Sequence, residues 1–243
     1  MIPLRDANPT QRRPVVTIGL IALCVLAFGW ELWLQAESGD AGLERLFRDW
    51  ALVPGDLTAA LRGDGALGHP LATVITSMFL HGGWIHLGGN MLYLWIFGNN
   101  VEDRFGRLPF LLFYLFGGVV AAAAQVVIDP TSTTPVLGAS GAIAAVLGAY
   151  LVLYPGARVL SLVFLGFFYQ LLQIPAVIVL GLWFILQLIN GAMSLGVPSS
   201  AGGVALFAHI GGFAAGALVA LLVRTTGGAR SRRNGPLDEF RVG

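Results

Sequence analysis

The sequence is poor in charge, contains no lysine and has a single cysteine. Charged residues make up 11% of its 243 residues, against about a quarter in a typical globular chain. The fourteen basic residues are all arginine, and a formal net charge of +1 provides no field that would hold a polyanion. These features exclude a nucleic-acid-binding protein and a disulfide framework. Because Cys24 lies in an apolar run, we expect it to be a small buried hydrophobic residue.

The chain has more apolar residues than a water-soluble fold of its size can bury. Hydrophobic residues account for 56% of the sequence, and the mean hydropathy is +0.77. Much of this surface must therefore face lipid, which excludes a cytosolic enzyme, a secreted disulfide scaffold and a disordered chain. We expect no cleavable signal peptide, because the N-terminus is polar and the first apolar run is long.

Six apolar segments approach the length of membrane-spanning helices, which need about twenty mainly apolar residues. A seventh stretch, Val159–Leu172, would reach only about 21 Å as a helix, so we expect a re-entrant or interfacial segment there. The sequence thus predicts an all-α membrane protein with six transmembrane helices. The six expected spans are Val15–Leu34, Trp84–Val101, Leu108–Val127, Ser140–Tyr154, Ile174–Ile189 and Val204–Val223.

The charges at the two ends of the chain predict its orientation. Residues 1–14 contain three arginines and one acid, and residues 224–243 contain five arginines and two acids. Arginine-rich flanks stay on the cytoplasmic side of a membrane, so we expect the N- and C-termini to be cytoplasmic. Two cytoplasmic ends require an even number of spans, which favours six over seven. The expected organisation is a cytoplasmic N-terminal tail, a membrane domain over 15–223 and a polar, flexible C-terminal tail.

Four polar residues lie inside the expected spans, where polar groups are costly and often functional: His86, Asn90, Ser140 and His209. Structural explanations exist for each. Ser140 begins a row of small residues that could simply pack against another helix, and His209 could hydrogen-bond a neighbouring helix. His86 and Asn90 share one helical face, but asparagine is a poor zinc ligand and no H-E-x-x-H motif occurs, so no metal site is expected.

The position of these residues along their helices places them in one layer. Counted at 1.5 Å per residue from the expected cytoplasmic ends, the two histidines and Ser140 lie about 22–24 Å above the inner boundary, and Asn90 about 18 Å. The G-x-x-x-G pair Gly212 and Gly216 and the small residues after Ser140 would let their helices approach closely. Ser140 and His209 could then form a hydrogen-bonded dyad, and the other two residues could donate to an oxyanion.

Other polar groups near this layer are interpreted as peripheral. Glu31 lies near the outer end of the first span and is expected to be an interfacial charge. A Ser–His dyad without a carboxylate is favoured here, because burying one would cost several kcal/mol. His69 and His81 precede the second span and are expected to be interfacial or solvated. The charge-free loop Ser194–Gly203 is a candidate gate for water.

With these residues in view, the sequence resembles the rhomboid family of intramembrane serine proteases, of the bacterial six-span type. Glu102-x-Arg104 and Gly106 fit a family pattern, and the resemblance extends over residues 15–223. The motifs that carry it are His81-Gly-Gly-Trp-Ile-His86-Leu-Gly-Gly-Asn90, Gly138-Ala-Ser140-Gly141 and Ala208-His209-x-x-Gly212-x-x-x-Gly216.

The resemblance implies a rhomboid-like bundle and a serine endopeptidase that cleaves transmembrane segments of membrane-protein substrates near their outer ends. It implies Ser140 as nucleophile and His209 as general base. His86, Asn90 and the Ser140 backbone amide would form the oxyanion hole, and Gly138 would shape the approach to the nucleophile. The family needs no cofactor or metal. Its members lie in the lipid bilayer, here expected to be a bacterial inner membrane.

The resemblance also implies a lateral path for substrate, past the fifth span, where Trp183 and Phe184 are candidate gate residues. The apolar stretch Leu71–Leu80 would lie partly in the membrane. One position departs from the family pattern: an aromatic residue often follows the serine by one turn and packs on the histidine, but here that residue is Ala144. The imidazole must then find another support, for which Phe213 is a candidate.

Two other functions stay open. One is a proteolytically inactive rhomboid-like protein that binds transmembrane helices, although such relatives typically lack the serine or the histidine that are present here. The other is a small transporter or channel with the polar layer as its binding site. Transporters usually have internal repeats and paired broken helices, and the sequence has no repeat.

Overall fold

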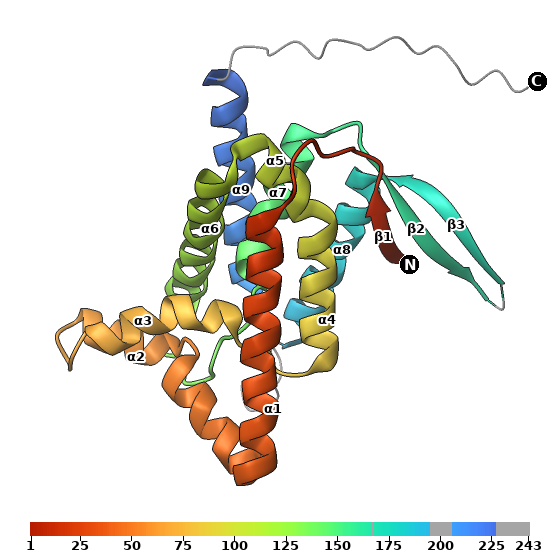
Figure 1. Ribbon diagram of the computed structural model, residues 1–243. Helices are drawn as coiled ribbons and strands as arrows, with labels where there is room; N and C mark the ends of the chain where they lie inside the picture. Colours follow the sequence, from red (N-terminus) through yellow and green to blue (C-terminus); the bar gives the residue numbers. More distant parts are fainter. Residues whose placement is uncertain (167, 195–205, 227–243) are drawn as a thin grey trace, which may run out of the picture.

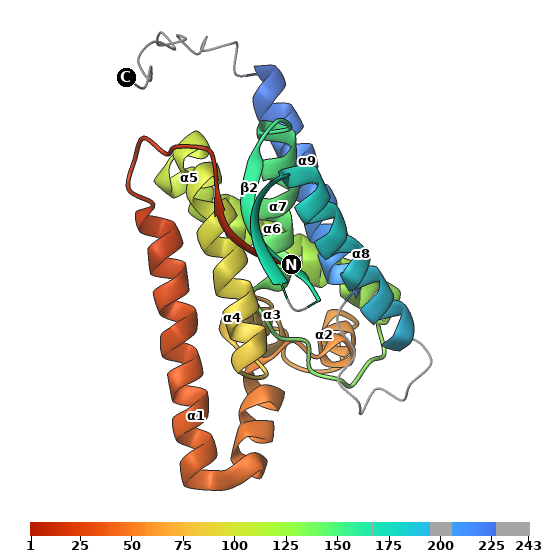
Figure 2. The same cartoon turned by 90° about the vertical axis from the view of Figure 1, so that its right-hand side faces the viewer.

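The computed structural model describes residues 1–166, 168–194 and 206–226 of the chain. Its main body is a bundle of helices that run along one direction, with two short helices across one end and a small sheet on one flank (Figure 1, Figure 2). The helical elements are α1 (Val15–Trp50), α2 (Pro54–Leu61), α3 (Gly68–Thr76), η1 (Ser77–Phe79), α4 (Trp84–Tyr93), η2 (Leu94–Gly98), α5 (Asn99–Phe105), α6 (Arg107–Ile128), α7 (Ser140–Leu153), α8 (Ala176–Ser194) and α9 (Leu206–Thr226).

The described parts of the six expected spans are helical except at two ends: Ile174 and Pro175 belong to a strand, and Tyr154 follows the end of α7. Three helices, α1, α6 and α9, are long and apolar enough to cross a membrane, while α7 and the first part of α8 are shorter apolar helices. The protein is therefore a mostly helical membrane protein, as predicted. The count of six spans and the side of the termini stay predictions. Loop residues 195–203 of the candidate gate and the C-terminal tail beyond Thr226 lie outside the described residues.

Helix α1 extends well beyond the expected first span. It runs on to Gly39, whose positive φ of 65° interrupts the helical backbone; glycine adopts this conformation without a steric cost. The chain then turns back as helix to Trp50, and α2 begins at Pro54, a residue favoured in a first helical turn. Helices α2 and α3 lie across this end of the bundle (Figure 1).

Helix α7 forms the centre of the bundle and packs directly on α9. Every residue from 142 to 150 is buried, so α7 has no polar face, as expected for a helix surrounded by protein. A Cβ added to Gly216 would overlap the Ala145 carbonyl oxygen, and one added to Gly148 would overlap the Phe213 carbonyl oxygen. The two backbones are thus in contact, which confirms the close approach predicted from the small residues.

Helix α5 holds the beginning of α1. The buried carboxylate of Glu102 accepts hydrogen bonds from the Val16 and Thr17 backbone N–H groups, at 3.0 and 2.8 Å, and from Thr17 Oγ1 at 2.7 Å. The first turn of a helix has N–H groups without helical partners, and a carboxylate satisfies them and complements the helix dipole. Asp103 similarly accepts from backbone N–H groups of the chain before α1.

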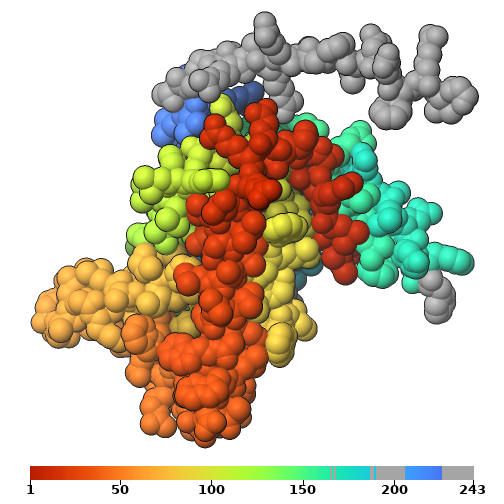
Figure 3. All heavy atoms as spheres, viewed as in Figure 1, coloured from red at the N-terminus to blue at the C-terminus, as the bar shows by residue number. Residues whose placement is uncertain are grey.

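The fold is not all-α, because a three-stranded antiparallel sheet occupies the flank. Strand β2 (Arg158–Leu165) pairs with β3 (Phe168–Pro175) and with β1 (Ile2–Asp6), in the order β1-β2-β3. The sheet projects from the side of the bundle (Figure 3). The expected re-entrant or interfacial stretch Val159–Leu172 is thus a hairpin, which suits its β-branched and aromatic residues. Its position in the membrane stays a prediction.

Strand β1 is fixed to the bundle through a buried carboxylate. Asp6 accepts hydrogen bonds from Asn100 Nδ2 at 2.6 Å and from the Tyr150 hydroxyl at 2.9 Å. Burial raises the pKa of the Asp6 carboxyl above its ordinary value of 3.8, and the bond from Tyr150 opposes this shift only in part. The N-terminal segment is therefore joined both to α5 and to α7.

Candidate active site

Ser140 and His209 are brought together by the contact between α7 and α9. Ser140 is the first residue of α7, and His209 lies in the first turn of α9. His209 Nε2 and Ser140 Oγ are 2.7 Å apart, which is a hydrogen bond between side chains 69 residues apart in sequence. The imidazole is only 3% exposed. A serine hydroxyl bonded to a neutral imidazole is the arrangement in which histidine can take the hydroxyl proton.

No carboxylate completes a triad with this pair among the described residues. His209 Nδ1 is buried and has no hydrogen-bond partner there. The imidazole is instead held by packing, because the ring centroids of Trp183 and His209 are 5.7 Å apart. The sequence-based candidate for this support, Phe213, packs on Phe184, with centroids 5.4 Å apart. The aromatic support for His209 therefore comes from Trp183 on α8 and not from Phe213.

Ala144 is small because α9 occupies the space above it. A Cβ added to Gly212 would overlap the carbonyl oxygen of Gly141 and would lie 3.4 Å from the Ala144 Cβ. Ala144 is completely buried. An aromatic side chain at this position would push α9, and with it His209, away from α7. The departure from the family pattern is therefore compatible with an intact Ser140–His209 hydrogen bond.

His86 lies beside the same serine, across Gly138. Gly138 has a φ of +124°, and a Cβ added to it would lie 2.7 Å from His86 Nε2 and 3.6 Å from Ser140 Oγ, so glycine is required for both reasons. His86 Nδ1 accepts a long hydrogen bond of 3.4 Å from the Gly82 N–H. This assigns the proton of a neutral imidazole to Nε2, the atom that faces Gly138. His86 therefore presents a donor next to the serine.

Asn90 lies one turn after His86 on α4, where it is buried. Within the described part of the chain its side-chain Nδ2 has no hydrogen-bond partner. A buried amide without a partner is costly unless something else accepts its hydrogen bond. The structure thus brings Ser140, His209, Gly138 and His86 together and places Asn90 on the same helix as His86 with a free donor.

Two residues that were interpreted as peripheral are buried next to His86. Glu31 is 2% exposed, and its Oε1 accepts a 3.0 Å hydrogen bond from the His81 backbone N–H. His81 is 1% exposed, its Nδ1 donates to the Phe79 carbonyl oxygen at 3.1 Å, and its ring packs edge-on against His86, with centroids 5.2 Å apart. The interfacial prediction for Glu31 and the interfacial or solvated prediction for His81 are therefore wrong, because α1 packs over the chain that leads into α4.

The candidate gate residue Trp183 links two helices at this level. Its ring lies 6.0 Å from that of Tyr93, at the end of α4, and 6.5 Å from that of Phe184. The same indole supports His209. The rings of Tyr93 and Trp183 therefore connect α4 to α8, and Trp183 also contacts His209 of the dyad.

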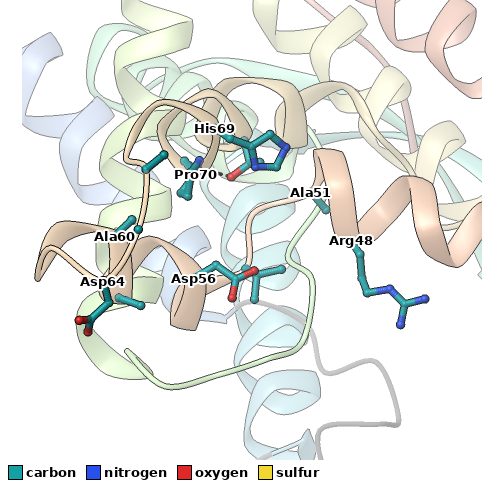
Figure 4. Close-up of a pocket in the computed structure, with 12 residues that line it drawn as sticks. Arg48, Ala51, Asp56, Ala60, Asp64, His69 and Pro70 are labelled. Atoms are coloured by element: carbon teal, nitrogen blue, oxygen red, sulfur yellow. Dashed lines mark hydrogen bonds between the residues drawn. The ribbon is translucent and has the colours of Figure 1, made fainter.

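A separate pocket lies among α1, α2 and α3 (Figure 4). Arg48, Asp56, Asp64 and His69 are among its lining residues, and His69 is exposed. None of the residues of the polar layer lines it. We therefore assign the pocket no part in the chemistry of Ser140.

Comparison with known proteins finds rhomboid relatives. The rhomboid domain model matches residues 69–226, which contain all of the candidate site residues. The chain is 34% identical over 139 residues to the rhomboid protease GluP of Bacillus subtilis, covering 57% of the chain and 24% of that protein. It is 32% identical over 165 residues to RHOMBOID-like protein 4 of Arabidopsis thaliana, covering 67% of the chain and 37% of that protein.

A longer match is found at lower identity. RHOMBOID-like protein 12, mitochondrial, of Arabidopsis thaliana is 28% identical over an alignment of 226 positions that covers 81% of the chain and 62% of that protein. The chain covers only 37% of RHOMBOID-like protein 4 and 24% of GluP, so it spans less than half the length of these two relatives.

Proposed function

The chain belongs to the rhomboid family, and from this premise we propose that it is an intramembrane serine endopeptidase that uses Ser140 and His209 as a catalytic dyad. The observation that carries the proposal is the 2.7 Å hydrogen bond between Ser140 Oγ and His209 Nε2. The family also contains members without proteolytic activity, and the presence of both side chains in hydrogen-bond contact supports the protease over the inactive alternative. The substrates are membrane proteins cleaved in or near their transmembrane segments.

The reaction follows from the contacts around Ser140. His209 Nε2 takes the Oγ proton as Oγ attacks the scissile carbonyl carbon. The C–N bond then breaks, and His209 returns the proton to the departing amine. Water attacks the acyl group in the second half, with His209 again taking and returning a proton, and frees Ser140. No metal or cofactor is required for these steps.

The negative charge on the carbonyl oxygen is stabilised by donors on the α4 side of the serine. His86 carries an Nε2 proton next to Gly138, and Asn90 has an unused amide N–H. The backbone N–H of Ser140 lies at the N-terminus of α7, where N–H groups are free and the helix dipole favours negative charge. Removing one such donor typically reduces kcat by about 10²–10³-fold.

The test is covalent labelling of the full chain in lipid vesicles with a serine-reactive fluorophosphonate, followed by mapping of the adduct. We expect labelling of Ser140, and loss of labelling in Ser140→Ala and in His209→Ala. Ser161→Ala is the matched control, because Ser161 is buried in β2 with its hydroxyl on a backbone carbonyl, and it should label like the wild type. A folded protein without an adduct would overturn the proposal and favour the inactive helix-binding alternative.

We further infer that the protein lies in a bacterial inner membrane with both termini in the cytoplasm. The arginine-rich segments at the two ends support this orientation. Protease protection of tags at the two termini in inside-out and right-side-out vesicles tests it. Both tags should be cut only when the cytoplasmic side faces the protease, and cleavage from opposite sides would contradict it.

A further inference from the structure

The sheet has a second face that no part of the described protein covers. One face packs on the helices along β1 and the first part of β2, where Asp6, Val159 and Ser161 are buried, whereas Phe168 and Leu172 of β3 are exposed on that face. Residues opposite one another in neighbouring strands point to the same side, so the register defines the other face. Ile2 pairs with Leu162, which pairs with Leu171, and Phe164 pairs with Tyr169. A sheet whose outer face meets water carries polar residues there, whereas this one carries two rows of apolar residues.

This outer face is exposed and changes character along the strands. Leu171 is 57% exposed and Tyr169 71% exposed. At the other end of the same face lie Arg5, opposite Leu160, and Arg158, the first residue of β2, and both arginines are exposed. The distance from Arg158 to Phe164 along the strand is about 20 Å, at about 3.3 Å per residue. The face is thus basic at one end and apolar and aromatic at the other.

The basic end of the sheet coincides with the expected cytoplasmic end of the bundle. It lies at the end of the bundle where α1 begins and α5 is found, and β2 and β3 run obliquely from there away from the helices, so that their far ends lie at about the mid-height of the bundle (Figure 1). The change from basic to apolar residues along the strands therefore follows the change in polarity with depth in a membrane leaflet. The arginines lie at the level of the lipid phosphates, and the aromatic side chains lie deeper.

The basic end of the sheet adjoins a surface that lipid must cover, because Pro175, the last residue of β3, pairs with Arg158. Strand β3 runs into α8 without a loop, and the Ala176 N–H donates to the Ala157 carbonyl oxygen at 2.8 Å. The first turns of α8 expose Val177, Ile178 and Ile185 to the outside of the bundle. The free edge of β3 has backbone groups without partners in the sheet, and such groups are not tolerated in the hydrocarbon core. The sheet therefore belongs in the interfacial part of the leaflet.

We propose that the outer face of the β1-β2-β3 sheet is a binding surface for anionic phospholipid of the cytoplasmic leaflet. The rows around Leu171 and Tyr169 contact acyl chains, and Arg5 and Arg158 bind the lipid phosphates. The planar guanidinium group suits phosphate oxygens because it can donate two parallel hydrogen bonds. Lipid bound here lies against the strand that leads into α8, the helix that carries Trp183.

The apolar half of the proposal is tested with a fluorescent bimane label at single cysteines. Cys24→Ala removes the only native thiol, and Leu171→Cys places the label on the outer face. Ile185→Cys on α8 and Asp64→Cys on the α2–α3 loop are the lipid-exposed and water-exposed controls. In vesicles of phosphatidylcholine and phosphatidylglycerol with brominated acyl chains, we expect the Leu171 label to be quenched like the Ile185 label and protected from iodide.

A Leu171 label that is quenched by iodide like the Asp64 label would overturn the proposal, because the face would then be in water. Protection from both quenchers would also overturn it, since a second copy of the chain would then cover the sheet. Neither readout depends on proteolysis, so a failure here is distinguishable from a failure of the proposed activity.

The basic half is tested by the thermal stability of the full chain in neutral detergent with added short-chain lipid. Phosphatidylglycerol should raise the midpoint of unfolding more than phosphatidylcholine does. The double variant Arg5→Gln, Arg158→Gln should lose at least half of that difference. Arg62→Gln, an exposed arginine at the end of α2, is the matched control and should keep it. An equal response to both lipids, or an equal loss in the control, would overturn the phosphate contacts.

Discussion

Replacing Gly212 by alanine tests whether the backbone contact between α7 and α9 holds the dyad together. The added Cβ would overlap the Gly141 carbonyl oxygen, one residue after Ser140, and would lie 3.4 Å from the Ala144 Cβ. A carbon atom needs about 3.3 Å from a carbonyl oxygen. Neither of these neighbours is a flexible side chain that could move aside, so the two helices must separate instead.

The size of the effect follows from the geometry of the dyad. A separation of about 1 Å added to the 2.7 Å Ser140–His209 distance takes the pair beyond hydrogen-bond range. A displacement of that size can reduce an enzymatic rate about a hundredfold. Overpacking a core by one methyl group costs about 1–3 kcal/mol, so the fold itself should survive.

The assay is the rate at which the fluorophosphonate labels Ser140 in vesicles, measured together with the thermal midpoint. Gly29→Ala is the matched control, because a Cβ added on that exposed face of α1 meets no atom within 4 Å. It should label at the wild-type rate and gain up to about 1 kcal/mol from helix propensity. If Gly212→Ala also labelled at the wild-type rate, the helix contact would not be what positions the dyad.

Three further substitutions test individual hydrogen-bonding carboxylates, one near the site and two that hold the fold together. Glu31→Ala removes the acceptor of the His81 N–H and should slow Ser140 labelling more than Glu31→Gln, which keeps an oxygen; equal losses would contradict the hydrogen-bond role. Glu102→Ala leaves the first turn of α1 uncapped and should cost about 1–3 kcal/mol in thermal unfolding, whereas an unchanged midpoint would argue against capping. Burial raises the pKa of Asp6, so its contribution to stability is fully present below its ordinary value of 3.8 and is lost as the pH rises through the folded value. The thermal midpoint of Asp6→Asn, relative to that of the wild type, should therefore rise from about pH 4 to about pH 7. A relative rise on acidification would contradict the upward direction of the Asp6 pKa shift.

The helical elements and the α7–α9 contact could be predicted from sequence because their signals are local. Long apolar runs indicate helices in lipid, and the small residues from Ser140 to Gly148 and the Gly212–Gly216 pair indicate helices in close contact. Counting residues along each helix then placed Ser140 and His209 at one level, and the structure has them in hydrogen-bond contact. Their catalytic roles stay predictions that the labelling experiment tests.

The sheet could not be predicted because its determinants are distant in sequence. A short apolar run such as Val159–Leu172 fits a strand or a helix equally well by periodicity. What selects the strand is pairing with β1, near the N-terminus, and the anchoring of Asp6 by Asn100 and Tyr150. Such long-range contacts leave no local pattern.

The burial of Glu31 could not be predicted from sequence for a related reason. An acid near the end of a span can reach the membrane surface, and the sequence contains nothing that distinguishes this from burial. The chain between η1 and α4 folds against α1 and supplies the His81 N–H as a partner. A charge-bearing residue inside an apolar helix is by default a candidate for function, and that principle would have selected Glu31.

The small side chain at position 144 and the packing of Trp183 on His209 both follow from one packing constraint. The backbone contact of α7 with α9 needs a small residue at 144, because Gly212 lies directly above it. The imidazole of His209 then has no aromatic support from its own neighbour α7 and takes it from Trp183 on α8. The same indole meets Tyr93 on α4. Moving α8 away from α4 to admit a substrate segment would therefore also remove the support of the proposed general base, so access to the site and the order of the dyad are coupled.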